Sequence, residues 1–206
     1  MQDYQKTWND RYGGGEHIFG KEPNEYFQKK INTLTPGSIL LPGDGEGRNG
    51  VYVAGKGWDV TSADFSEIAL ERAKEFASQR NVKLNFQFIN LITEELPQNK
   101  YDVVGVSFLH FNGENKGIVY RKLSETIKVG GYLILECFST EQIKLNSGGP
   151  RKKDSLYTVK ELKDYFEGFE FIEAEDIKIQ LHEGKGHQGD AYVVRIFARK
   201  LKRQND

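Results

Sequence analysis

The sequence predicts an α/β fold built on a doubly wound, mostly parallel sheet of seven strands that ends in an antiparallel strand. Three observations predict it. From residue 38 onward, apolar runs short enough for strands alternate with segments of helical periodicity. A glycine-rich loop, Gly43-Asp-Gly-Glu-Gly47, joins the first apolar run to a segment suited to a helix. Two extended runs joined by a glycine-rich stretch close the chain, which is the pattern of an antiparallel hairpin.

Composition indicates one medium-sized domain, 1–206, with an N-terminal helical lid or cap over 1–32 and a sheet core over 38–200. The 29 basic and 30 acidic side chains nearly cancel, so neither nucleic acid nor a membrane surface is an expected partner. One cysteine, Cys137, excludes an internal disulfide. The polar start of the chain, and the absence of an apolar stretch of about 20 residues, favour a soluble, cytoplasmic protein.

The first half of the chain contains four predicted helices and three predicted strands. Aromatic residues spaced by four suit a short helix over 2–12, and Gly13-Gly-Gly15 ends it. Asn24 and Ser66 are expected N-caps, because their side chains accept hydrogen bonds from free backbone N–H groups. The remaining expected elements are a helix over 24–32, strands over 38–42, 58–64 and 83–89, and helices over 49–56 and 67–80.

The second half repeats the alternation and then departs from it. Lys128-Val-Gly-Gly131 is expected to be a turn, and the polar segment 140–155 a functional loop or cover. Thr158 is the expected cap of a helix that reaches Glu167. The other expected elements are strands over 101–108 and 132–139, a helix over 115–128, and extended runs over 169–181 and 191–200 separated by the loop 182–190.

The glycine loop has the layout of a nucleotide-type cofactor site at the carboxyl end of a first parallel strand. Glycines let the backbone approach a ligand closely and adopt positive φ without a Cβ clash. Asp64 ends the second predicted strand, about twenty residues after the first glycine. A carboxylate at that place can accept hydrogen bonds from both ribose hydroxyls of an adenosine group.

Several further motifs occur in a fixed order along the chain. They are Trp8-Asn-Asp-Arg-Tyr12, Phe19-Gly-Lys-Glu-Pro-Asn24, Gly45-Glu-Gly-Arg-Asn49, Asn90-Leu91, Ser107-Phe-Leu-His-Phe111, Lys128-Val-Gly-Gly131, Gln142 with Gly148-Gly-Pro150, and His187-Gln-Gly-Asp-Ala191. Together they resemble the class I S-adenosylmethionine-dependent methyltransferases, and specifically the tellurite-resistance/thiopurine-methyltransferase-like branch. This resemblance implies a Rossmann-like fold, S-adenosylmethionine as cofactor and a small-molecule methyl acceptor. The expected acceptors include soft nucleophiles, that is, thiol, selenium or tellurium species.

The resemblance also implies a set of site residues. Tyr12 and His110 are the expected catalytic contacts, and the pKa of a histidine lies near neutrality, which suits His110 to proton handling. Asp64 is assigned to the ribose, Asn90 and Leu91 to the adenine, and the glycine loop to the methionine end. The expected cofactor contacts are Gly43, Asp44, Gly45, Gly47, Asn49, Asp64, Phe65, Ser66, Asn90, Leu91, Ser107 and Phe108.

Departures from the family pattern leave alternatives open. Leu41 and Asn90 stand where acidic residues are usual. An NAD(P)-dependent oxidoreductase is one alternative, because Gly45-Glu-Gly-Arg-Asn-Gly50 also satisfies the dinucleotide fingerprint. A non-catalytic S-adenosylmethionine-binding protein is another. No metal site is expected, since His182 and His187 lack a third ligand at a recognisable spacing. The expected assembly is a monomer or a weak homodimer.

Overall fold

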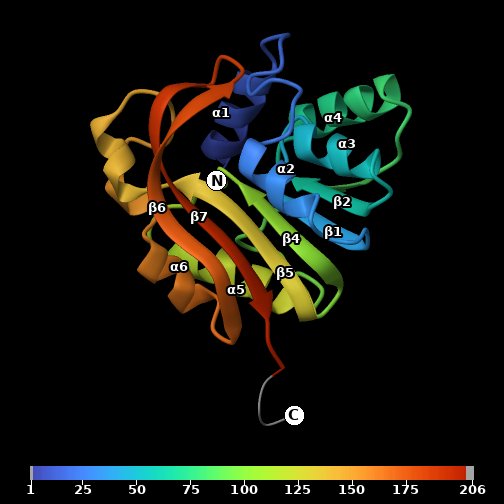
Figure 1. Cartoon of the computed structure of the whole chain (residues 1–206). Helices are drawn as coiled ribbons and strands as arrows, with labels where there is room; N and C mark the ends of the chain where they lie inside the picture. Colours follow the sequence, from blue (N-terminus) through green and yellow to red (C-terminus); the bar gives the residue numbers. More distant parts are fainter. Residues whose placement is uncertain (1, 203–206) are drawn as a thin grey trace.

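The structure is a computed structural model that describes residues 2–202, and it contains one sheet of seven strands (Figure 1). The strand order is β3-β2-β1-β4-β5-β7-β6. Strands β1 to β5 pair in parallel, whereas β7 is antiparallel to β5 and to β6. The predicted fold class is therefore confirmed. The strands are β1 (Ser38–Pro42), β2 (Asp59–Asp64), β3 (Asn85–Phe88), β4 (Tyr101–Ser107), β5 (Ile127–Phe138), β6 (Phe169–Glu183) and β7 (His187–Lys200).

Helices cover both faces of the sheet, as a doubly wound fold requires. In β1, Ile39 and Leu41 pack with helices on one face, while Leu40 packs into the core of the other. The first face carries α2, α3 and α4, and the second carries α5 and α6 (Figure 1). The helices are α1 (Gln2–Tyr12), α2 (Glu25–Ile31), α3 (Arg48–Ala54), α4 (Glu67–Gln79), α5 (Glu114–Thr126) and α6 (Val159–Tyr165), with short 3₁₀ turns at Thr140–Lys144 and Lys153–Ser155.

The three predicted N-caps are confirmed. The side chain of Asn24 accepts a hydrogen bond from the backbone N–H of Phe27 at 2.9 Å. Ser66 and Thr158 accept in the same way, each at 3.1 Å, from the third residue after them. Each cap satisfies a backbone donor that the helix itself leaves unpaired. The local sequence therefore determines where these helices begin.

Two predicted loops are wrong in extent. The expected turn Lys128-Val-Gly-Gly131 lies within β5, which starts at Ile127. The pairing register between β4 and β5 shifts at this place, and Gly130 has a positive φ of +83° there. The expected loop 182–190 is mostly strand, because β6 runs to Glu183 and β7 starts at His187. Glycines suggested loops at both places, but the long ladder with neighbouring strands determines the backbone conformation. In residues 2–202, no helix combines the length and the apolar character needed to cross a bilayer.

Candidate functional site

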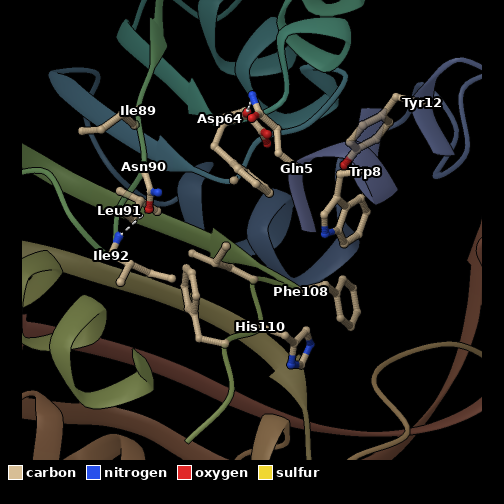
Figure 2. A pocket seen from close by; sticks show the side chains of 14 residues that line it. Gln5, Trp8, Tyr12, Asp64, Ile89, Asn90, Leu91, Ile92, Phe108 and His110 are labelled. Atoms are coloured by element: carbon tan, nitrogen blue, oxygen red, sulfur yellow. Dashed lines mark hydrogen bonds between the residues drawn. The ribbon is translucent and has the colours of Figure 1, made fainter. Parts of the chain in front are cut away.

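Two adjoining cavities open at the carboxyl ends of the parallel strands. The larger cavity has a volume of about 220 Å³ and the smaller cavity one of about 50 Å³. Tyr12, Gly43 and Phe108 line both and stand between them. Figure 2 shows the larger cavity, surrounded by the labelled side chains Gln5, Trp8, Tyr12, Asp64, Ile89, Asn90, Leu91, Ile92, Phe108 and His110. The smaller cavity is lined by Tyr12, Phe19, Gly20, Gly43, Asp44, Gly45, Glu46, Arg48, Asn49, Ser107, Phe108 and His187.

The glycine loop leaves β1 and has positive φ at all three of its glycines. The φ angles of Gly43, Gly45 and Gly47 are +66°, +58° and +81°. A Cβ on Gly45 would come within 2.7 Å of the hydroxyl of Tyr12, so only glycine fits beneath that side chain. A Cβ on Gly47 would instead come within 2.8 Å of Ala73 in α4. Gly45 therefore shapes the cavities, and Gly47 allows close packing of two helices.

Asp64 lies at the end of β2 beside the glycine loop, and it borders the larger cavity. Its two carboxylate oxygens accept hydrogen bonds from the backbone N–H groups of Gly45 and Ser66, each at 2.9 Å. The side chain is 7% exposed, and this burial raises the pKa of the carboxyl group. Together with a further backbone hydrogen bond from Phe65, these contacts fix the carboxylate in one orientation and leave acceptor capacity for a ligand.

Asp44, in the middle of the loop, places its carboxylate beneath the loop. Oδ2 accepts a hydrogen bond from the hydroxyl of Ser62 at 2.7 Å. A Cβ on Gly50 would approach this oxygen to 2.5 Å, which explains the glycine in that turn of α3. Oδ1 is buried and has no hydrogen-bond partner among the described residues. Desolvation is the main reason that the pKa of Asp44 rises to about 7.

Asn90 and Leu91, which the sequence assigns to the adenine, follow β3 and border the larger cavity. The side-chain oxygen of Asn90 accepts a hydrogen bond from the N–H of Ile92 at 3.0 Å, which is drawn in Figure 2. The backbone N–H of Asn90 donates to Glu94 at 2.7 Å. These bonds hold the turn after β3 against the cavity.

The end of β4 has a strained conformation. Phe108 has φ +52°, a region that residues with a side chain rarely occupy. Its ring contacts those of Phe138 and His187, with centroids 4.7 and 4.4 Å away. Beside it, the hydroxyl of Ser107 accepts a hydrogen bond from Asn49 at 3.2 Å. Backbone strain of this kind persists only where surrounding contacts enforce it, and it occurs often at functional sites.

The N-terminal segment covers the cavities and is attached to the loops below it. Tyr12 is 5% exposed and stacks on Trp8, with ring centroids 5.4 Å apart. Burial is the main cause that raises the pKa of Tyr12, and the neighbouring carboxylates of Asp64 and Glu46 raise it further. A guanidinium nitrogen of Arg72 in α4 donates to the carbonyl of Tyr12. The hydroxyl of Tyr12 thus remains protonated at neutral pH.

His110 borders the larger cavity, but its ring nitrogens lie close to backbone groups. Nδ1 is 2.9 Å from the carbonyl oxygen of Ser155, and the N–H of Phe138 is 3.5 Å from Nε2. Burial lowers the pKa of His110 to about 4. The imidazole is therefore neutral at physiological pH and connects the end of β4 to the segment 140–155.

A buried polar network beside the smaller cavity is absent from the sequence prediction. Glu183 accepts hydrogen bonds from Arg48 and Asn24, each at 2.9 Å, and its Oε2 lies 3.0 Å from Nδ1 of His187. Asn24 also donates to Glu136 at 2.6 Å. Asn24, Arg48 and His187 belong to motifs that the sequence shows, namely Phe19–Asn24, Gly45–Asn49 and His187–Ala191, whereas Glu183 and Glu136 lie outside these motifs and are brought to them by the fold.

Most of the predicted site residues therefore lie around the two cavities. Gly47 and Ser66 do not line either of them: Gly47 is the N-cap residue of α3, and Ser66 caps α4. No group of three His, Cys, Asp or Glu side chains suited to a metal ion occurs in the described part of the chain.

Comparison with known proteins assigns the family. A family model of the tellurite resistance protein TehB matches residues 23–200. The chain belongs to the TehB tellurite-resistance family. "Probable S-adenosyl-L-methionine-dependent methyltransferase TehB" of Haemophilus influenzae is 28% identical over 194 residues, which are 85% of this chain and 66% of that protein. "Probable thiol methyltransferase 2" of Arabidopsis thaliana is 29% identical over 190 residues, or 89% of this chain and 80% of that protein.

Solved structures agree on the fold. The crystal structure of TehB from Haemophilus influenzae has a TM-score of 0.72 at 24% identity, covering 86% of this chain and 62% of that one. A structure described as "Conversion of a Disulfide Bond into a Thioacetal Group during Echinomycin Biosynthesis" has a TM-score of 0.75 at 18% identity, covering 98% and 94%. The predicted methyltransferase branch is confirmed, and with it S-adenosylmethionine as the cofactor.

Proposed function

We propose that this TehB-family chain is an S-adenosylmethionine-dependent methyltransferase that acts on a small, soft nucleophile such as a thiol, selenium or tellurium species. The observation that carries the proposal is the family match over residues 23–200, together with Asp64 held against Gly45 at the site where an adenosine group would bind. Because the match spans only 66% of the Haemophilus influenzae relative, activity and acceptor are inferences for this chain.

The larger cavity suits the adenosine part of the cofactor. Asp64 is assigned to the ribose hydroxyls, and Asn90 with Leu91 to the adenine. The methionine end is assigned to the loop from Gly43 to Gly47, where the buried, unpaired oxygen of Asp44 supplies an acceptor for a positively charged ligand. Phe65 and Phe108 border the space between these parts. The residues present therefore fit the cofactor.

When bound, S-adenosylmethionine supplies a methyl group that its sulfonium makes electrophilic. The task of the chain is to hold donor and acceptor in line and to keep water out. Tyr12 lies between the two cavities, and its ring face, like that of Trp8, is suited to a cationic group. We propose that residues 1–32 form a lid. In its described part, Gln5 donates a hydrogen bond to the segment after β2, and Arg72 of α4 donates a hydrogen bond to the lid.

A small acceptor is supported by the dimensions and the surface of the smaller cavity. Its volume of about 50 Å³ leaves room for only a few heavy atoms. Aromatic rings of Phe19 and Phe108 line it, and such rings suit polarisable sulfur. The relative in Arabidopsis thaliana is named a thiol methyltransferase, which supports the same acceptor class. We propose a cytoplasmic monomer or weak homodimer that needs no nucleic-acid partner.

Calorimetric titration with S-adenosylmethionine, S-adenosylhomocysteine and NADH tests the cofactor assignment. We expect saturable binding of both adenosyl ligands and none of NADH. Binding of NADH alone would favour the oxidoreductase alternative that the Gly45–Gly50 fingerprint leaves open. If the adenosyl ligands bind but no thiol, selenite or tellurite is methylated, the chain is a binding protein and not an enzyme.

A further inference from the structure

Two histidines line the cavities, and they differ in what their ring nitrogens contact. In His110, Nδ1 lies 2.9 Å from the carbonyl oxygen of Ser155 and Nε2 lies 3.5 Å from the N–H of Phe138. Its ring stacks on that of Phe138, with centroids 5.6 Å apart. An imidazole placed in this way positions backbone segments, and neither nitrogen is well placed to receive a proton from a ligand.

His187 has the opposite arrangement. It is the first residue of β7 and pairs across the hairpin with Glu183, whose Oε2 lies 3.0 Å from Nδ1. His187 is 4% exposed and borders the smaller cavity. Nε2 forms no hydrogen bond among the residues whose side chains the structure describes. One nitrogen is thus bound to a carboxylate, while the other has no partner in that part of the chain.

The carboxylate of Glu183 determines which nitrogen of His187 carries the proton. Arg48 and Asn24 donate to Glu183, each at 2.9 Å. Burial raises the pKa of this carboxyl group, but the hydrogen bond from His187 and the charge of Arg48 outweigh it and lower the pKa to about 2. An ionised carboxylate only accepts hydrogen bonds, so Nδ1 must be the donor. The lone pair of neutral His187 is therefore on Nε2.

Aromatic packing holds the ring of His187 in place next to the end of β4. The ring centroids of Phe108, Phe19 and Phe138 lie 4.4, 4.5 and 5.2 Å away. Phe108 borders both cavities, so His187 faces the smaller cavity at the point where it adjoins the larger one. This is where a small acceptor would lie beside a cofactor in the larger cavity.

We propose that His187, oriented by Glu183, is the catalytic base that removes the proton of a neutral thiol or selenol bound in the smaller cavity. The S–H bond of the acceptor breaks, Nε2 binds the proton, and the electron pair stays on sulfur as a thiolate. The imidazolium then returns its proton to solvent. The proposal rests on the methyltransferase function proposed above, and it transfers the role of proton acceptor from His110 to His187.

Charged groups from three elements face His187. Glu183 on β6 stabilises the imidazolium, whereas Arg48 on α3 and Arg11 on α1 disfavour it, and burial lowers the pKa of His187 further. His110 is also within electrostatic range. These effects keep His187 neutral before the thiol binds, which is the form a base needs.

The test compares His187→Asn with the wild-type protein in single-turnover methyl transfer. The amide nitrogen of Asn takes the place of Nδ1 and preserves the donor to Glu183, while the base at Nε2 is lost. With 2-mercaptoethanol, which is largely a neutral thiol at pH 7, we expect a rate about 100-fold lower, the low end of general-base effects. With hydrogen sulfide, which ionises near neutrality and fits the smaller cavity, we expect a far smaller loss. His182→Asn, the other and exposed histidine of this hairpin, is the matched control.

A second readout does not depend on turnover. Ultraviolet difference spectra of 2-mercaptoethanol bound in the presence of S-adenosylhomocysteine report the thiolate directly. We expect the thiolate signal to appear at a lower pH with the wild-type and His182→Asn proteins than with His187→Asn, because only the imidazole offers the proton a second site at Nε2. Equal loss of rate for both thiols, or an unchanged thiolate signal in His187→Asn, would overturn the role of His187. If S-adenosylhomocysteine does not bind to the wild-type protein, the methyltransferase proposal itself fails.

Discussion

Asp64→Asn gives the sharpest test of how the site holds its cofactor. Each oxygen of Asp64 accepts one backbone hydrogen bond, from Gly45 and from Ser66 at 2.9 Å. An amide has only one acceptor oxygen, so its NH₂ group replaces an oxygen that accepts one of these N–H groups, and that position can no longer accept from a ribose hydroxyl. Hydrogen bonds to charged groups are worth about 1.5–3 kcal/mol each. Loss of one such bond to the ribose, about 2–3 kcal/mol, weakens binding about 30- to 150-fold.

Calorimetric titration with S-adenosylhomocysteine measures this loss. Asp59→Asn is the matched control, because Asp59 is at the other end of β2, is exposed, and its carboxylate accepts a hydrogen bond from the side chain of Asn85 at 3.2 Å. The control should bind like the wild-type protein. Thermal unfolding without ligand should show Asp64→Asn destabilised by about 1–3 kcal/mol, since a buried N–H group loses its acceptor. Binding by folded Asp64→Asn within twofold of the wild-type affinity would refute the ribose assignment.

Two further predictions concern the glycine loop. Gly45→Ala and Gly57→Ala both introduce a Cβ at positive φ, which costs about 1–2 kcal/mol, but only the first meets the Tyr12 hydroxyl at 2.7 Å. Calorimetry should therefore show weaker cofactor binding for Gly45→Ala alone, and equal losses in both variants would contradict the contact. For Asp44, the raised pKa means that the folded protein binds the proton more tightly, so stability is lost as pH rises from 3.8 to about 7. Denaturation should show Asp44→Asn gaining about 1–2 kcal/mol relative to wild type between pH 5 and pH 8, and a pH-independent difference would contradict this.

Sequence patterns predict the parts of this molecule that depend on local chemistry. Asn24, Ser66 and Thr158 begin their helices as expected, because a capping side chain and its target lie three residues apart. The strand order also follows, since alternating strands and helices and a closing hairpin leave few arrangements. Asp64 and Gly45 meet because parallel strands end at the same edge of the sheet.

Contacts between distant segments could not be predicted in the same way. Glu183 joins Asn24, Arg48 and His187 only because β6 and β7 fold back over the end of β4. Nothing in the spacing of these residues indicates that three of them share a carboxylate. For the same reason the sequence favours His110 as the proton acceptor, whereas the structure shows which of the two histidines has an uncommitted nitrogen beside a cavity.

The activity proposed for this protein is methyl transfer to a small, soft nucleophile. It is tested most directly by incubating the protein with S-adenosylmethionine that carries a deuterated methyl group and with 2-mercaptoethanol, selenite or tellurite under reducing conditions. Mass spectrometry of the products should show the labelled methyl group on sulfur, selenium or tellurium, and the label should decrease sharply with Asp64→Asn. If the cofactor binds but no acceptor gains the label, the chain is not the methyltransferase proposed here.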